Sequence, residues 1–166
     1  MKKLFPIIVL ITLLLATLTP NLFAAAAGDS VCTQSLASYP STSSQPLVRM
    51  LTFTCTADST DGSFLAMPFT QTHVDKITGY FLYKLILNPG ATAPTDNWDF
   101  TITDSDGIDL LGGTGANMHT TNSAMIAPKL NSTTYFAQPI FTAPTLNITG
   151  NSINSAIIVI RAIFVK

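Results

Sequence analysis

Residues 155–165, SAIIVIRAIFV, give the clearest secondary-structure signal in the chain. β-Branched residues dominate this stretch, which favours a strand over a helix. In a period-two pattern its apolar side chains fall on both faces, a pattern typical of a central strand or of a sheet whose outer face meets a partner. The stretch therefore predicts a long central strand near the C-terminal end of the chain.

Shorter strand signals extend from this stretch back toward the N-terminus. Residues 51–56, LTFTCT, alternate strictly between apolar and polar, as in a strand buried on one face. Residues 57–62 and 104–107 are turn signals, and the latter, DSDG, contains the Asp-Gly pair typical of a hairpin turn. A short helical turn is expected near 122–126. Further strands are predicted at 63–69, 76–87, 98–103, 108–111, 136–141 and 145–149.

Seven or eight short strands without a long helical pattern indicate an all-β fold. We predict a small antiparallel β-sandwich or jelly-roll-like domain over residues 47–166. Residues 28–46 are rich in Ser, Thr, Pro and Gln, so they are expected to form a loosely organised N-terminal arm. Pro68, in the strand expected at 63–69, indicates an edge or a strand end.

The first residues have the three zones of a secretory signal peptide. Lys2 and Lys3 precede an apolar run over residues 4–18, and the small residues 24–27 supply an A-x-A cleavage site. The run is shorter than the roughly 20 residues that a membrane-spanning helix needs. We therefore predict that residues 1–27 are cleaved, that no membrane contact remains afterwards, and that the protein is secreted, periplasmic or extracellular.

Charge argues against a nucleic-acid partner. The chain has eight Lys and Arg against nine Asp and no Glu, so removal of Lys2 and Lys3 changes the net charge from −1 to −3. Such a chain lacks the basic surface that attracts nucleic acid. Low charge density with abundant apolar residues also argues against disorder.

The chain contains two cysteines, Cys32 and Cys55. Export would place them where disulfides persist, and their spacing matches neither a redox motif nor a zinc motif. We expect a structural disulfide that pins the N-terminal segment to the sheet.

From about residue 47 to 166, the order of elements resembles a family of small phage proteins thought to be virion-associated. Three stretches carry the resemblance: KITGYFLYK at 76–84, PGATAPTDNWDFTITD at 89–104 continuing through SDGIDLLGGTGAN at 105–117, and the apolar strand at 155–165. The signal peptide and the cysteine pair depart from this family. The resemblance implies a structural role, a location in the virion if the protein is phage-encoded, and no catalytic residues.

Asp104, Asp106 and Asp109 are weak candidates for calcium ligands, because Ca²⁺ prefers several hard oxygen ligands. The chain has no Glu to complete a calcium loop, so a turn capped by its own Asp side chains is the main interpretation. His73 and His119, the two histidines, are expected in solvated loops rather than at zinc. No cofactor is expected.

Trp98, Tyr80, Tyr83 and Tyr135 could form an aromatic platform for sugars. Trp98 shares a strand face with Phe100 and Ile102, which favours the core.

No catalytic motif is present in the sequence: it has no Gly-x-Ser-x-Gly, and nothing singles out a pair of Asp residues. The leading hypothesis is therefore a non-enzymatic structural or assembly module that associates with itself or with a larger particle. The alternative is a secreted ligand-binding module for carbohydrate or calcium.

Overall fold

The computed structural model describes residues 29–40 and 46–166, so the predicted signal peptide lies outside the described residues. Nine strands and one short helix are found in the described part of the chain. Their bounds are β1 Val31–Tyr39, β2 Val48–Thr56, β3 Met67–Pro68, α1 Gln71–Ile77, β4 Phe81–Pro89, β5 Asp99–Thr103, β6 Ala124–Ile126, β7 Gln138–Pro139, β8 Thr145–Thr149 and β9 Ile157–Val165.

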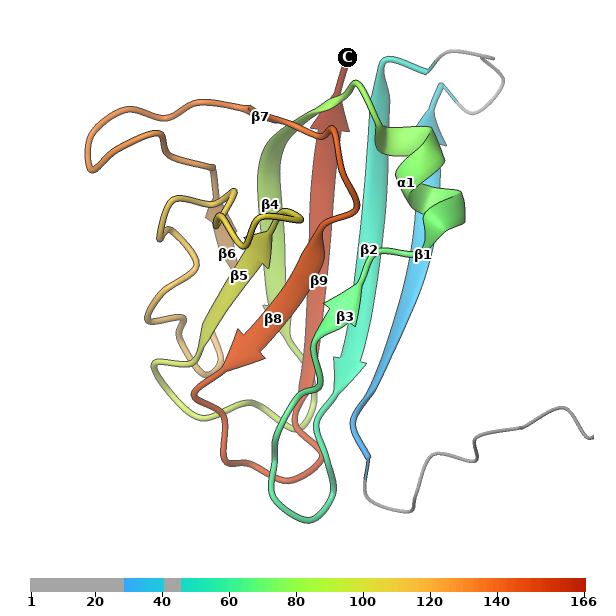
Figure 1. Ribbon diagram of the computed structural model, residues 1–166. Coiled ribbons are helices and arrows are strands. Elements are labelled where there is room, and N and C mark those ends of the chain that lie inside the picture. The colour runs from blue at the N-terminus through green and yellow to red at the C-terminus, as the bar shows by residue number, and fades with distance from the viewer. Residues whose placement is uncertain (1–28, 41–45) are drawn as a thin grey trace, which may run out of the picture.

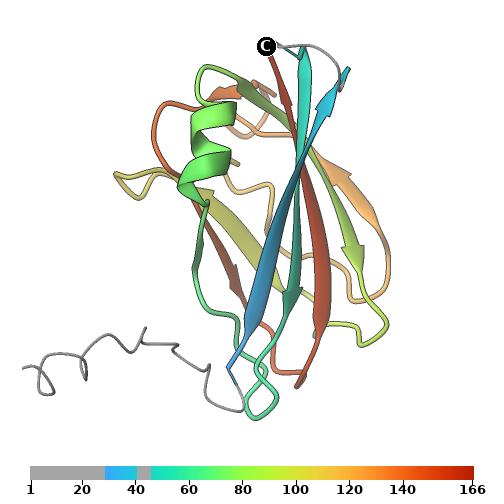
Figure 2. The same ribbon diagram turned by 90° about the vertical axis from the view of Figure 1, so that its right-hand side faces the viewer.

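The strands form two antiparallel sheets that face each other (Figures 1 and 2). The larger sheet has the order β1-β2-β9-β4-β6, and β7 also pairs with β4. The smaller sheet has the order β3-β8-β5. The prediction of an all-β sandwich is confirmed.

β9 lies at the centre of the larger sheet, as its sequence predicted. It pairs with β2 along its whole length on one side and with β4 on the other. Ile158, Ile160, Ala162 and Phe164 point into the sandwich and are fully buried. The alternate side chains, on the outer face of the sheet, are half-buried.

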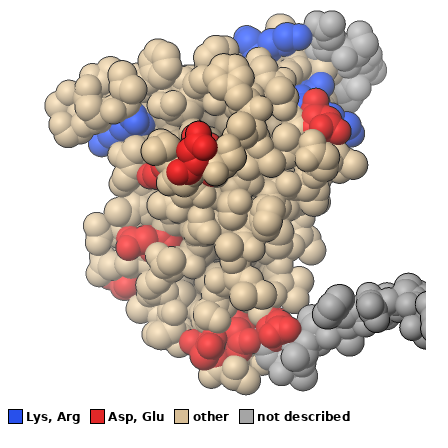
Figure 3. All heavy atoms as spheres, viewed as in Figure 1, with Lys and Arg blue, Asp and Glu red and all other residues tan. Residues whose placement is uncertain are grey.

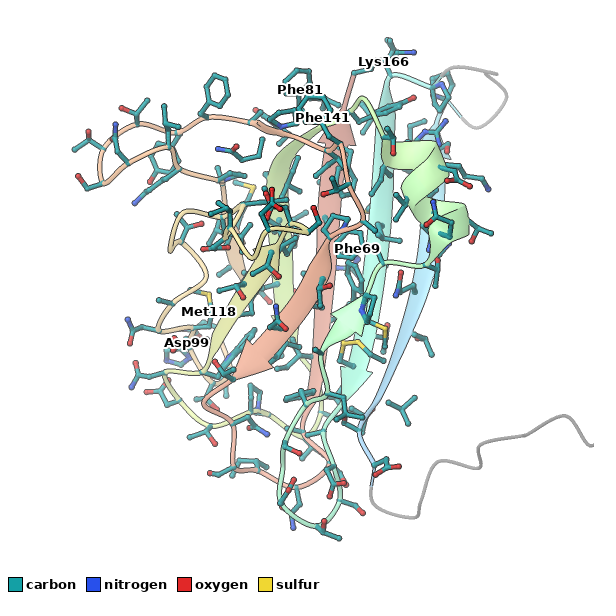
Figure 4. The ribbon with its side chains drawn as sticks, viewed as in Figure 1. Phe69, Phe81, Asp99, Met118, Phe141 and Lys166 are labelled. Atoms are coloured by element: carbon teal, nitrogen blue, oxygen red, sulfur yellow. A yellow bond between two sulfur atoms is a disulfide. The ribbon has the colours of Figure 1, made fainter. Side chains whose placement is uncertain are left out.

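The core fills the space between the two sheets. Phe100 and Ile102 of β5, with Leu146 and Ile148 of β8, face the buried side chains of β2, β9 and β4. Phe69 enters from the segment before α1, and its ring lies 4.8 Å from that of Phe53 (Figure 4). Truncating one of these phenylalanines to alanine would cost about 3–5 kcal/mol, because the cavity cannot fully close.

The strand predicted at 76–87 is wrong at its start, where α1 occupies Gln71–Ile77. Val74 and Ile77, three residues apart, are its buried residues, so tertiary packing holds this short helix where propensity is weak. The helix lies at the same end of the sandwich as the C-terminus (Figures 1 and 2). In the described part of the chain, no helix is long and apolar enough to cross a membrane.

β4 contains an irregularity that strict alternation does not predict. Its register with β9 shifts between Leu82 and Lys84, as in a β-bulge. Leu82, Leu85 and Leu87 therefore all face the core, although strict alternation places Leu82 on the other face. Strict alternation would place Phe81 and Tyr83 on the face of Leu85 and Leu87, but both are exposed.

The expectation of a loose arm is wrong for residues 31–39, which form β1. This strand pairs with β2 from Val31↔Thr56 to Tyr39↔Val48 without a register shift. Gln34 points inward, where its Nε2 donates to the Pro68 carbonyl at 2.8 Å and its Oε1 accepts from the Thr70 N–H at 3.0 Å. The side chain thus joins the edge of the larger sheet to the segment entering α1.

The structure also differs from three local predictions. The helical turn expected near 122–126 is wrong, because Ala124–Ile126 form β6 against β4. The return strand expected at 108–111 is reduced to one bridge, Thr103↔Asp109. The strand expected at 63–69 is reduced to β3, whose Pro68 lies on the edge of the smaller sheet as predicted.

Candidate functional site

The four aromatic candidates divide into two pairs. Trp98 is 1% exposed, and its indole N–H donates to the His119 carbonyl at 3.4 Å. Tyr80 is also buried, with its hydroxyl donating to the Pro46 carbonyl at 2.6 Å. These two aromatic residues are therefore part of the core and cannot form a platform. Tyr83 and Tyr135 are 51% and 63% exposed, and both line one surface pocket.

The pocket has a volume of about 740 Å³. Tyr83 and Lys84 come from β4, and Met125 and Ile126 come from β6 beside it. Lys129 and Tyr135 come from the connection between β6 and β7, which projects from the upper left of Figure 1. Gly113 and Thr114 complete the wall from the loop after β5.

Local backbone geometry places these side chains. The bulge in β4 turns Tyr83 outward, so that it stands next to Lys84 at the rim. Lys129 and Tyr135 form an antiparallel bridge. The tip between them is capped by the Asn131 side chain, whose Oδ1 accepts from the N–H groups of Thr133 and Thr134 at 3.0 and 2.9 Å.

Gly112 fixes how close this connection comes to the β5 side of the pocket. Its φ is +60°, and a Cβ there would collide with the Lys129 carbonyl oxygen. The Lys129 N–H also donates to the Leu111 carbonyl at 3.1 Å. A glycine is therefore needed for the two loops to approach each other.

The pocket is basic in an acidic protein. The Lys84 ammonium lies 5.7 Å from the centroid of the Tyr83 ring, and the Lys129 ammonium lies 5.1 Å from that of Tyr135. Both distances are in the range of cation–π attraction. No Asp is among the described residues that line the pocket.

The predicted turn at 104–107 is present, with a different geometry from a two-residue type I′ hairpin. The N–H of Gly107 donates to the Asp104 carbonyl at 3.2 Å, and the Asp104 N–H donates to the Ile108 carbonyl at 3.0 Å. Gly107 has a φ of +81°, whereas Asp106 does not have a positive φ. This is a three-residue loop in which a type I turn is followed by a left-handed residue.

The carboxylates of Asp104 and Asp109 accept hydrogen bonds from their own turns. Asp104 Oδ1 accepts from the N–H groups of Asp106 and Ile108, both at 2.9 Å. Asp109 accepts from Leu111 at 3.0 Å and from Gly113 at 2.8 Å. Within residues 29–40 and 46–166, no group of three or more His, Cys or Asp is placed to hold a metal ion.

The histidines lie on separate elements. His119 lies in the loop between β5 and β6, where its Nδ1 accepts from the N–H groups of Thr121 and Asn122 at 3.0 and 3.1 Å. His73 lies on α1 rather than in a loop, with Nδ1 2.8 Å from the Thr70 hydroxyl oxygen. Burial, and after it the charge of Lys76, hold the pKa of His73 below its ordinary value.

Cys32 and Cys55 are directly paired residues of β1 and β2, and their sulfur atoms are at disulfide-bonding distance. Cys55 is buried in the core. The pair therefore links the edge strand to its neighbour near the start of β1.

β1 is an open edge of the larger sheet. Its sequence, VCTQSLASY, contains no charged residue and no proline, and β2 is its sheet partner within the described residues. Val31 and Tyr39 at its two ends are 53% and 50% exposed. The outer face of β9 is also apolar, apart from Arg161.

Charges are unevenly distributed along the molecule. The basic side chains visible in Figure 3 lie in its upper part, and a group of acidic side chains lies at its lower end. The β2–β3 turn, with Asp58 and Asp61, is at this lower end (Figure 1). The Thr60 hydroxyl, and next its N–H, donate to Asp58 and hold the pKa of that carboxyl below its ordinary value.

Sequence reasoning did not identify the pocket. It named Tyr83 and Tyr135 among four aromatic candidates but did not single out Lys84 or Lys129. The adjacency of Tyr83 and Lys84 was a usable local signal. The approach of Lys129 depends on the β6–β7 connection folding back toward the loop after β5, for which the sequence contains no periodic signal.

A scan against protein-family models found no match, and a search of curated proteins found none either. Among solved structures, the chain is similar to one described as "Cyanophage Pam1 capsid asymmetric unit". The two share 16% sequence identity with a TM-score of 0.34, over 84% of this chain and 86% of that chain. The site described above therefore rests on this chain's own residues.

Proposed function

We propose that this protein is an exported, non-enzymatic assembly module that associates with copies of itself through the open edge of β1. The observation that carries the proposal is the character of that edge. Proteins that remain monomeric usually protect a long edge strand with charges, prolines or bulges. β1 extends over nine residues and has none of these.

A second copy of β1 fits this edge as its partner. In an antiparallel pair centred on Ser35, each Val31 lies opposite the Tyr39 of the other copy, and the two Ser35 residues lie opposite each other. The exposed apolar ends of the strand would then become cross-strand pairs, which stabilise antiparallel sheets. Because β1 carries no charge, the pairing brings no like charges together within the strand. A two-fold arrangement of this kind closes as a dimer.

Sedimentation at rising concentration tests the proposal. The average mass of the wild-type protein should rise toward that of a dimer. Ser35→Lys places two lysines directly opposite each other in the pair, so it should keep the protein monomeric. Thr54→Lys is the matched control, because Thr54 is also exposed on the outer face but lies on β2. A wild-type protein that stays monomeric at all concentrations would refute self-association through β1.

The second candidate function is that of a secreted ligand-binding module. The specific observation in its favour is the pocket in which Tyr83 and Tyr135 stand beside Lys84 and Lys129. The calcium form of this alternative has less support, because the turn N–H groups already donate to Asp104 and Asp109. A strict monomer that binds a glycan would favour the ligand-binding function over assembly.

A further inference from the structure

The pocket lined by Tyr83, Lys84, Lys129 and Tyr135, here called the Lys–Tyr pocket, takes no part in the proposed assembly through β1. It lies at the β4–β6 side of the larger sheet, and β1 is the opposite edge in the strand order. A ligand in the pocket and a second copy on β1 would therefore not compete for the same strand. The two proposals can fail independently.

Charge determines the first property of a ligand for this pocket. Two ammonium groups line it without a carboxylate among the described lining residues, while the whole chain carries a net charge of −1. The ammonium groups of Lys84 and Lys129 each have a tyrosine ring as a neighbour. An anionic ligand would supply the missing charge partners.

The tyrosines determine the second property. Tyr83 and Tyr135 expose half or more of their surface, and Met125, which also lines the pocket, is 66% exposed. A site with apolar and aromatic walls and a few polar groups binds ligands that present a flat apolar face and a polar edge. The C–H face of a pyranose ring has this character, and its hydroxyls can bond to the tyrosine hydroxyls.

We infer that this pocket binds an acidic saccharide, with Lys84 and Lys129 pairing to carboxylates on sugar rings that stack on Tyr83 and Tyr135. One carboxylate per ring matches the arrangement of the site, in which each ammonium stands beside one aromatic ring. A nucleic acid also combines rings with charge. Its dense phosphates, however, need a basic surface broader than two lysines, and this chain is acidic overall.

Titration calorimetry with a tetramer of galacturonic acid is the test. The wild-type protein should bind it, and added salt should weaken the binding because the lysine–carboxylate attraction is screened. A neutral malto-tetraose should bind at least about tenfold more weakly, as expected when two charged contacts are lost. Lys84→Gln with Lys129→Gln should weaken galacturonate binding by about tenfold or more on the same basis.

Two controls separate the pocket from general effects of charge and aromatic surface. Lys76→Gln removes an exposed lysine on α1, and Phe141→Ala removes an exposed phenylalanine after β7, outside both the pocket and β1. Both variants should bind galacturonate like the wild type, whereas Tyr135→Ala should bind it several-fold more weakly. The melting temperature of each variant verifies that it is folded. If the double lysine variant does not fold, Tyr135→Ala still tests the pocket without changing its charge.

Three results would overturn the inference. The first is no galacturonate binding by the wild-type protein at low salt. The second is equal binding of the neutral and acidic tetramers. The third is tighter binding of a thymidine oligonucleotide of matched charge, which would assign the pocket to nucleic acid.

Discussion

Gly107 illustrates how one residue sets the geometry of a turn. Its φ of +81° is unfavourable for side chains other than glycine, and no atom lies within 4 Å of the place where its Cβ would be. Gly107→Val should therefore destabilise the protein by backbone strain alone, by about 1–2 kcal/mol. Gly107→Asn is the matched control and should cost less, because asparagine tolerates this region. Thermal melting measures both.

The same turn tests the calcium interpretation of Asp104. Asp104→Asn keeps the Oδ1 that accepts from Asp106 and Ile108, so it should be nearly neutral. Bound calcium would instead raise the melting temperature of the wild-type protein by mass action. The melting temperature measured with calcium and with a chelator therefore distinguishes a turn from a calcium site. A calcium-dependent rise that disappears in Asp104→Asn and Asp106→Asn would assign these carboxylates to a metal.

His73 predicts a dependence of stability on pH. Burial and Lys76 lower its pKa in the folded protein, so the unfolded chain takes up the proton more readily. The contribution of uncharged His73 to the free energy of unfolding is fully present above the pKa of the unfolded chain, about 6.5. This contribution is lost as the pH falls through the pKa of the folded protein. The melting temperature should fall between pH 7.5 and 5, and His73→Gln should reduce that fall. Thr72→Ala is the neighbouring control, and an unchanged fall in His73→Gln would contradict the assignment.

At the scale of elements, the disulfide fixes the edge strand. Cys32 and Cys55 are separated by 23 residues along the chain, a loop whose closure contributes about 3 kcal/mol through the unfolded state. Reduction should therefore lower the melting temperature by roughly 10 °C for a domain of this size. The same reductant should leave Cys32→Ser unchanged. Two free thiols in the native exported protein would rule out the bond.

Elements were predictable from sequence where a run of strand-forming residues or a strict alternation marks them. β9 was predicted from its many β-branched residues, and β2 from the apolar–polar alternation of residues 51–56. β1 was missed because Gln34 occupies an inward position where an apolar residue would be expected, and its amide forms hydrogen bonds across the sandwich edge. α1 was missed because its seven residues depend on the burial of Val74 and Ile77, a tertiary effect.

The residues of the pocket were less predictable than the core, for a related reason. Alternation correctly assigned Trp98 to the core, because Trp98, Phe100 and Ile102 follow the strand period. Strict alternation would place Tyr83 on the same face as Leu85, but the bulge in β4 shifts the period by one residue and turns Tyr83 outward. Lys84 and Lys129 approach one pocket only through the β6–β7 connection, and alternation carries no information about loops.

At the scale of the whole molecule, we predict that the N-terminal segment, which lies outside the described residues, is removed during export. The N-terminal charges, apolar run and alanine box predict a mature N-terminus between Ala25 and Gly28. Mass spectrometry of the exported protein should give a mass that corresponds to this N-terminus. Material that still carries Met1 to Lys3 would show that the signal is retained.

The direction of the strands determines how the molecule would respond to a pulling force. β1 and β9 are both antiparallel to β2, so the chain enters the larger sheet at its lower end and leaves at its upper end (Figure 1). Tension applied before Val31 and after Val165 runs along the strands and loads the β2–β9 hydrogen bonds together, in shear. The Cys32–Cys55 link transfers that tension to β2 one residue after the start of β1. Mechanical strength in the oxidised protein is therefore set by the pairing of β9 with β2 and β4, while the part of β1 after Cys32 stays free of tension.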